Sequence, residues 1–267
     1  MSPERTPSAA RGFTLVELGV VMMIVALLLG SVLYTLSGQL EQRSFEETRG
    51  RLETARELLL SYAIVNGRLP CPATATSSGD EVPLGGGNCT SPYGGFLPAR
   101  TIGFQVVDPG GYAIDSWQNR IRYAVSAAVP VNSQSPRICR PVSDTTPPVA
   151  PHFTDRNNLK FQGIDCQPSD LIICRSATGI TPTTCGGLAN QVMTQNLVVA
   201  IVFSVGKNGS LACAPCVDEG ANINGDQVFV SHTPAPTGAT NGEFDDYLIW
   251  ITVGELYGKL ISAGVLP

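Results

Sequence analysis

The chain has 267 residues, which is enough for one large domain or two small ones. Charged residues make up only 15%, the formal net charge is −5, and glycine (28) and proline (20) are abundant. This composition favours a loop-rich extracytoplasmic domain over a charged cytosolic enzyme, and no basic stretch would follow a phosphate backbone, so nucleic acid is not an expected partner.

An apolar segment at residues 13–36 is the first element along the chain, and Glu17 is its one charged residue. As a helix these residues would extend roughly 36 Å, enough to cross a hydrocarbon core of about 30 Å. A secretory signal has a shorter apolar run, with a small-residue cleavage site after it. The sequence therefore predicts a transmembrane helix at 13–36.

Glu17 is unusual because a carboxylate inside an apolar span is costly and needs a partner or a reason. If the chain were cut between Gly12 and Phe13, the new α-amino group of Phe13 would lie four residues from Glu17. That amine could pair with Glu17 within one helix or between two subunits. Alternatively, Glu17 is a carboxylate favoured near a helix N-terminus by the helix dipole. The spacing alone does not separate these alternatives.

The stretch Gly12-Phe13-Thr14-Leu15-Val16-Glu17-Leu18, with the apolar run after it, resembles the cleavage and methylation motif of type IV prepilins and type II secretion pseudopilins. The resemblance implies a cytoplasmic leader at 1–12, cleaved after Gly12 by a prepilin peptidase that also methylates the Phe13 amine. It implies that Glu17 pairs with the Phe13 amine of a neighbouring subunit during assembly. The filament-tip pseudopilins typically lack this glutamate, so its presence argues against that subfamily.

Residues 37–66 continue without proline, and apolar residues recur along them at mostly helical spacing, as in an amphipathic helix: Leu40, Phe45, Leu52, Ala55, Leu59 and Tyr62. Gly67 and Pro70 predict the end of the helix. The segment 13–66 is thus expected to be one helix. Many type IV pilins have a proline in the membrane half of this helix, and this chain has none.

The segment 67–267 is expected to be an extracytoplasmic body, beginning with a Gly- and Pro-rich surface loop at 67–101. Strand-like runs follow at 102–107, 120–129, 197–205, 226–231 and 246–253. The predicted fold is α+β, with the long N-terminal helix packed on an antiparallel sheet and with disulfide-bonded loop insertions.

Eight cysteines all follow the apolar segment, and an even number on one side of a membrane favours disulfides in an oxidising compartment. Their pairing cannot be deduced from the sequence. Arginines lie on both sides of 13–36, so charge does not decide the orientation. The cysteines and the family resemblance place the leader inside and the body outside. The cysteines are Cys71, Cys89, Cys139, Cys166, Cys174, Cys185, Cys213 and Cys216.

Two further stretches, 115–123 and 203–209 with Asp245-Asp246 and Trp250, resemble patterns of the major pseudopilins. In that family the later loop can hold a calcium ion. The carboxylates of Asp245, Asp246 and Asp226, with Asn222 and Asn224, are the oxygen ligands that this chain offers. The alternative is that these side chains cap turns in a solvated loop.

Signals for an enzyme are weak. Cys213-Ala214-Pro215-Cys216 lies in a Gly- and Asn-rich loop, which favours a structural disulfide over a redox pair or a zinc site. The histidines are His152 and His232, and a serine–histidine–aspartate triad forms in space rather than in sequence. The motifs G-x-S-x-G, H-E-x-x-H and G-x-x-x-x-G-K-S/T are absent from the sequence, so we expect no enzymatic activity.

The sequence therefore predicts a structural subunit of a type IV pilus or type II secretion-like filament, which grows through head-to-tail contacts. The bulk of residues 13–267 favours a minor pilin or pseudopilin. The alternatives are a major pilin that forms the fibre, or an adhesin or binding module that is only anchored by a pilin-type helix. The expected location is the inner membrane with a periplasmic body, followed by the filament. Expected partners are a prepilin peptidase, other pilins or pseudopilins, an inner-membrane assembly platform and membrane lipid.

Overall fold

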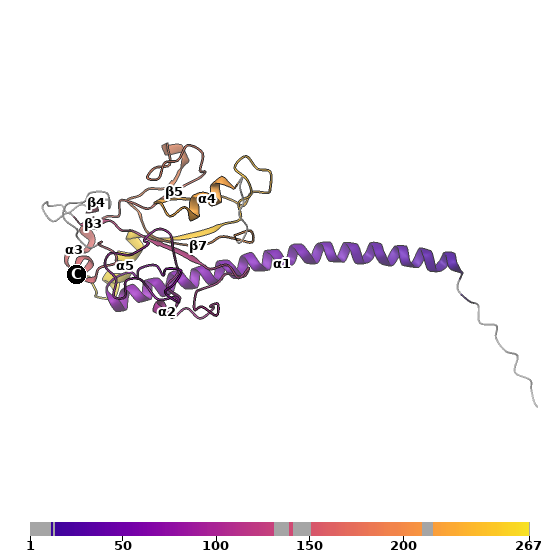
Figure 1. The fold of residues 1–267 in the computed structure, drawn as a ribbon, viewed down its shortest axis with the longest axis horizontal. Coiled ribbons are helices and arrows are strands. Elements are labelled where there is room, and N and C mark those ends of the chain that lie inside the picture. The colour runs from indigo at the N-terminus through magenta and orange to yellow at the C-terminus, as the bar shows by residue number, and fades with distance from the viewer. Residues whose placement is uncertain (1–11, 13, 131–138, 141–150, 210–215, 267) are drawn as a thin grey trace, which may run out of the picture. The chain divides into compact units, whose positions relative to one another are not determined.

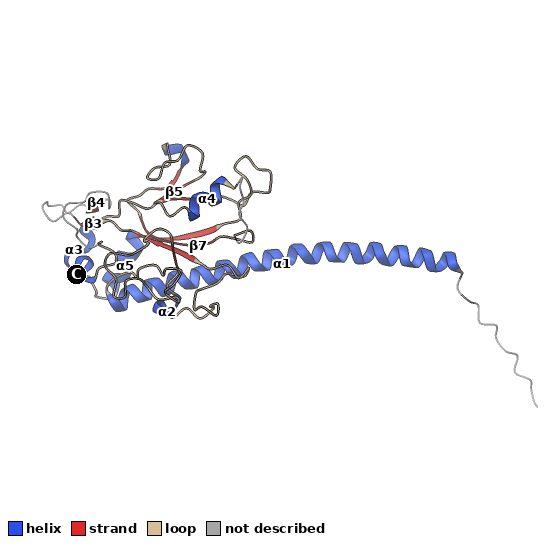
Figure 2. Cartoon of the chain, in the orientation of Figure 1, coloured by secondary structure: helices blue, strands red, loops and turns tan. Residues whose placement is uncertain are grey.

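A computed structural model of the chain describes residues 12, 14–130, 139–140, 151–209 and 216–266, without the side chains of 31–38, 130, 139–140, 161–162 and 165. The fold is α+β (Figures 1 and 2). The chain divides into two compact units, Met1–Glu46 and Glu47–Pro267. The second unit begins inside the long helix rather than after it, because Leu52, Ala55 and Leu59 are fully buried in its core.

Helix α1 runs over Leu15–Asn66. It ends where the Gly67 N–H donates to the Ala63 carbonyl at 2.8 Å, with Gly67 at a φ of +68°, a left-handed conformation that glycine adopts at helix ends. In the first unit, the large apolar side chains from Leu15 to Leu29 are 42–89% exposed. No helix among the described residues combines the length and the sustained apolarity that crossing a bilayer takes.

The main sheet of the body has four strands, β1 (Gly95–Phe96), β2 (Arg122–Val125), β7 (Val198–Ser204) and β9 (Tyr247–Thr252), in the order β1-β2-β7-β9. All three pairings are antiparallel. Alternate residues of a strand point to opposite faces. Tyr123 and Val202 therefore pack with the buried face of α1, while Ala124 and Phe203 contribute to a second core on the other face.

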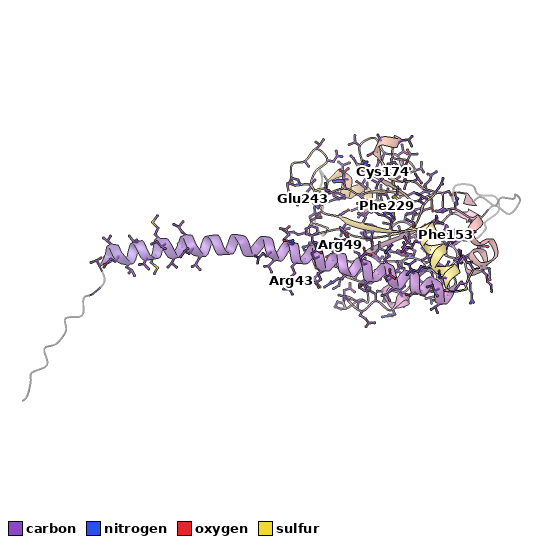
Figure 3. The ribbon with its side chains drawn as sticks, turned by 180° about the vertical axis from the view of Figure 1, so that it is seen from behind. Arg43, Arg49, Phe153, Cys174, Phe229 and Glu243 are labelled. Atoms are coloured by element: carbon purple, nitrogen blue, oxygen red, sulfur yellow. A yellow bond between two sulfur atoms is a disulfide. The ribbon has the colours of Figure 1, made fainter. Side chains whose placement is uncertain are left out.

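A mixed three-stranded sheet supplies the rest of that second core. Its strands are β5 (Ile172–Cys174), β6 (Gln191–Met193) and β8 (Val228–Val230), with β5 antiparallel to β6 and parallel to β8. In Figure 3, Phe153 marks the core on the α1 side of the main sheet and Phe229 the core on the other side. The body is thus layered as helix, main sheet and second sheet.

Shorter elements complete the described part of the chain. They are α2 (Ala99–Ile102), β3 (Val129–Pro130), β4 (Cys139–Arg140), α3 (Arg156–Gln162), the 3-10 turns Gly163–Asp165 and Leu188–Asn190, α4 (Val217–Ile223) and α5 (Val253–Ser262).

Four of the five strand-like runs contain a strand, but the prediction for 102–107 was wrong. Ile102 ends α2, and Gly103 follows it in a left-handed conformation with a φ of 78°. The stretch that follows Cys216 was also interpreted as a Gly- and Asn-rich loop, and this was wrong in part, since α4 occupies Val217–Ile223.

Disulfides staple the body as the sequence predicts. Cys71 bonds Cys89, and Cys174 bonds Cys185. Cys166 and Cys216 are also disulfide-bonded, and no described cysteine is free. The side chain of Cys139 and all of Cys213 lie outside the described residues.

A buried ion pair closes the start of the loop at 67–101. The Arg68 guanidinium donates to both carboxylate oxygens of Glu81, at 2.8 and 2.6 Å, and the two side chains are only 7% and 4% exposed. Glu81 also accepts hydrogen bonds from the N–H groups of Cys71 and Gly85 and from the Tyr62 hydroxyl. Tyr62 is on α1, so this network joins the end of the helix to the loop.

Candidate functional site

The N-terminal motif lies at the start of α1. Gly12 is exposed, and Phe13 lies outside the described residues. The backbone N–H and the hydroxyl of Thr14 both donate to Glu17 Oε2, at 2.9 and 2.8 Å, and the Glu17 N–H donates back to Thr14 Oγ1 at 3.3 Å. These reciprocal bonds form a capping box, which satisfies N–H groups at the helix N-terminus. In the structure of the full chain, Glu17 thus adopts the helix-terminus role that the sequence left open.

The two stretches that resemble pseudopilin patterns contact each other in the body. The Ser204 hydroxyl donates to Asp115 Oδ2 at 2.6 Å, and the Asn119 amide donates to the Gly206 carbonyl at 2.6 Å. Arg51 of α1 donates to the carbonyls of residues 114 and 115. These contacts join α1, the turn at 115–119 and β7, so the first stretch has a structural role in packing the body.

A difference from the family pattern is visible in the same turn. Gln118 stands where that pattern has glycine, and its backbone adopts a φ of 70°. A left-handed conformation costs most residues roughly 1–2 kcal/mol. Gln118 therefore adopts, in this turn, a conformation that glycine would adopt at lower cost.

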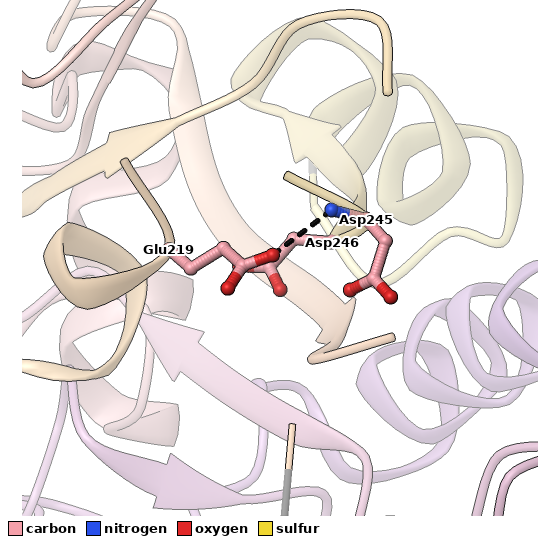
Figure 4. A group of neighbouring side chains, drawn as sticks. All are labelled: Glu219, Asp245 and Asp246. Carbon is pink, nitrogen blue, oxygen red and sulfur yellow. Dashed lines mark hydrogen bonds between the residues drawn. The ribbon is translucent and has the colours of Figure 1, made fainter. Parts of the chain in front are cut away.

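Three carboxylates gather beside the second stretch (Figure 4). Glu219 comes from α4, and Asp245 and Asp246 come from the segment that leads into β9. The three side chains can place one carboxylate oxygen each within 4.8 Å of the others. All three residues are buried, with exposed fractions of 8%, 8% and 5%.

Hydrogen bonds hold these carboxylates in place, but Asp245 keeps one buried oxygen that accepts none from the described residues. The Asp245 N–H donates to Glu219 Oε1 at 3.0 Å, and the Asn208 amide donates to both Glu219 oxygens at 3.1 Å. The N–H groups of Lys207 and Asn208 donate to Asp245 Oδ2. Asp245 Oδ1 is buried and accepts no hydrogen bond from any described residue.

The electrostatics of this acidic group favour a cation. Burial, together with the neighbouring charge of Glu219, raises the pKa of Asp245 to about 6. Burial likewise raises the pKa of Asp246 well above its ordinary value, although the hydrogen bond from Asn222 opposes the shift. Like charges close together disfavour joint ionisation, and a bound divalent cation would compensate them.

The residues fit calcium in their chemistry. Calcium takes oxygen ligands from carboxylates, carbonyls and water, and the unpartnered Asp245 Oδ1 is such a ligand in a buried position. Gly206 permits this arrangement, because a side-chain carbon there would lie 1.9 Å from Asp245 Oδ1. Glu219, Asp245 and Asp246 would hold the ion, which would neutralise their charge and tie α4 to the start of β9.

The sequence-based set of ligands is only partly brought together. Asp245 and Asp246 are adjacent, but Asp226 lies outside the group, because its carboxylate accepts from the Asn224 amide and the Val228 N–H, both at 2.8 Å. Asn222 uses its amide on Asp246 and its oxygen on the Val230 N–H. Glu219 was missed because the stretch around it was interpreted as a loop.

Neither histidine forms a triad with the described residues. His152 is fully buried, with Nε2 3.1 Å from the Tyr257 hydroxyl. His232 Nε2 lies 3.1 Å from Asp218 Oδ2, and the Ser176 hydroxyl contacts the same aspartate at 3.4 Å. The aspartate thus stands between serine and histidine, whereas a triad needs the histidine in the middle.

The described residues therefore offer two candidate sites, the N-terminal motif around Glu17 and the acidic group in the body. Scans against protein-family models, curated proteins and solved structures find no match to the chain.

Proposed function

We propose that this chain is a subunit of a type IV pilus or type II secretion-like filament, of the minor pilin or pseudopilin type, processed after Gly12. The observation that carries this proposal is the position of the motif, which spans the start of α1 at Leu15 and places Glu17 in the first turn of the helix. Cleavage there would release a free amine at the tip of a helix of 52 residues. In a filament of this kind, such helices from neighbouring subunits would pack against one another.

The apolar first part of α1 supports this proposal. Its large side chains are exposed on all sides, and a helix that is apolar all round must be covered by lipid or by other helices. We place residues 13–36 in the inner membrane before assembly, with the leader at 1–12 in the cytoplasm. After extraction by the assembly platform, helices of other pilins or pseudopilins would cover the same surface.

The disulfides support a periplasmic body, because such bonds persist in oxidising compartments. A body whose described residues form three sheets is bulky for a repeated subunit, which favours a minor role. If the chain is instead a major pilin, it will be the most abundant protein in purified filaments. If it is only an anchored adhesin, crosslinking will join it to no other pilin.

Calcium binding by Glu219, Asp245 and Asp246 is part of the proposal, and it predicts a pH-dependent stabilisation. A ligand bound only by the native state stabilises it by about 2.7 kcal/mol at a concentration about 100 times Kd, equivalent to roughly 5–10 °C in Tm for a chain of this size. We expect calcium to raise the Tm of the full chain in detergent at about pH 8, relative to chelator.

The increase in Tm caused by calcium should be smaller at about pH 5 than at about pH 8. The pKa of Asp245 is raised to about 6 in the fold, so its contribution to the stability of the cation-free state is full below its unfolded pKa and is lost as pH rises through about 6. Calcium needs the ionised form, so its effect follows the opposite course. Glu219→Gln should abolish the shift, and Asp226→Asn, outside the group, should preserve it. Equal Tm values with calcium and chelator at both pH values would contradict the calcium site and would mean that these carboxylates only cap turns.

A further inference from the structure

Asp218 directly precedes Glu219 on α4 and is a buried anchor for that helix. It is 5% exposed. One carboxylate oxygen accepts from the Ala177 N–H at 2.6 Å, and the Asn241 amide donates to both oxygens at 3.0 and 3.2 Å. Its Oδ2 also lies 3.1 Å from His232 Nε2. Asp218 does not belong to the acidic group itself, so these contacts serve to hold α4.

His232 contacts the other segment that carries the carboxylates. Its ring stacks on Phe244 with 3.8 Å between ring centroids and 25° between planes. Phe244 is 1% exposed and directly precedes Asp245 and Asp246. His232 therefore touches the residue before Glu219 on one side and the residue before Asp245 on the other.

The ligand-bearing elements need such support. Helix α4 has seven residues and includes Gly220, and helices this short are not stable alone, so their position comes from tertiary contacts. The carboxylates of Glu219 and Asp245 also repel each other when ionised. Bonds from the Asp245 N–H to Glu219 and from Asn222 to Asp246 join α4 directly to this segment. The contacts of His232 add a second connection, through the residues that precede the ligands.

We infer that His232, bonded to Asp218 and stacked on Phe244, is a positioning residue that sets the spacing of the calcium-binding carboxylates. This inference rests on the proposed calcium site. Residues that orient metal ligands contribute strongly to affinity, since their replacement typically weakens metal binding by about 10–100-fold. Asp218 also links the site to the loop closed by the Cys174–Cys185 disulfide, because it accepts a hydrogen bond from Ala177 in that loop. We call Asp218, His232 and Phe244 together the brace.

The test is a calcium titration of the full chain in detergent by calorimetry, with the Tm of each variant in chelator measured in parallel. Asp218→Asn and His232→Ala should each raise the calcium Kd by about 10–100-fold with a smaller change of the cation-free Tm. The double variant should show little more than either single change, because both remove one unit. Asp226→Asn is the matched control and should leave Kd within about twofold, since Asp226 does not contact the brace.

Two other outcomes overturn the inference in different ways. If the wild-type chain gives no binding signal with calcium, the calcium site fails and the brace has nothing to position. If the wild-type chain binds while both variants bind equally well and only lose Tm, the contacts of His232 and Asp218 are structural alone. His232→Ala decides the case if Asp218→Asn fails to fold, because the His232 side chain is 24% exposed against 7% for Asp218.

Discussion

Glu81→Ala is expected to lower the free energy of unfolding by about 3–5 kcal/mol, because removing one partner of a buried ion pair leaves the other charge uncompensated. Both side chains of the pair between Arg68 and Glu81 are buried. The substitution would strand the Arg68 guanidinium and remove the acceptor for the Cys71 and Gly85 N–H groups. The loop would also lose the hydrogen bond from the Tyr62 hydroxyl on α1 to Glu81 and would keep only that from Arg68 to Tyr62.

The sign of the pH dependence follows from Glu81. Burial alone would raise its pKa, but the Arg68 guanidinium and the backbone N–H groups outweigh burial and hold the pKa below its ordinary value. A lowered pKa contributes stability above the unfolded value, which is lost as pH falls through the folded value. The loss in Glu81→Ala should therefore be largest near neutral pH and shrink in acid.

Urea unfolding of the full chain in detergent, followed by circular dichroism, measures this effect. Asp80→Ala is the matched control, because Asp80 pairs with Arg100 at 3.3 Å on the surface, where such pairs contribute about 0–1 kcal/mol. If the two variants lose the same stability, the buried network does not hold the loop.

Glu17→Gln is expected to reduce incorporation into filaments by roughly tenfold or more, a change that requires about 1.4 kcal/mol of assembly free energy. We propose that, during assembly, the Glu17 carboxylate forms an ion pair with the Phe13 amine of the adjacent subunit. Opposite charges attract strongly where the dielectric constant is low, although desolvation offsets much of the gain. The pair should fix the register of the helices more than it stabilises them.

The change to glutamine distinguishes the ion pair between subunits from the capping of the helix within one subunit. A capping box accepts either glutamate or glutamine at this position, so the bonds from Thr14 survive in Glu17→Gln while the charge is lost. Insertion, cleavage and folding should therefore be unchanged. Sheared filaments from cells that express the variant measure incorporation, and Glu46→Gln, an exposed carboxylate on the same helix, is the control. Wild-type incorporation of Glu17→Gln would mean that Glu17 serves only its own helix.

Hydrophobic runs located three strands of the main sheet, β2, β7 and β9, but missed β1, which lies in the stretch 67–101 that was expected to be a surface loop. β7 lies within 197–205 with every residue buried, and such a run is readable from the sequence. The prediction of a strand at 102–107 was wrong because Ile102 and Phe104 are buried as part of α2 and the turn after it, and not as part of a strand. A short apolar run does not distinguish a strand from a buried turn.

The acidic group shows where sequence reasoning stops. The resemblance to the pseudopilin pattern singled out Asp245 and Asp246, but Glu219 reaches them only because α4 forms. Gly220 and Asn222 lower the helix propensity of that stretch, and tertiary bonds such as Asn222 to Asp246 override it. Disulfide pairing is likewise set by the fold, so Cys71–Cys89 and Cys174–Cys185 could not be chosen from spacing.

The proposed function is tested most directly by the N-terminus of the chain in filaments. Filaments are sheared from cells with an active prepilin peptidase, and the intact mass and N-terminal sequence of this subunit are measured. Processing at the Gly12–Phe13 bond predicts a chain in the filament fraction that begins at Phe13 with a methylated amine. A chain that still begins at Met1, or that is missing from the filaments while it is present in the membrane, would contradict the proposal.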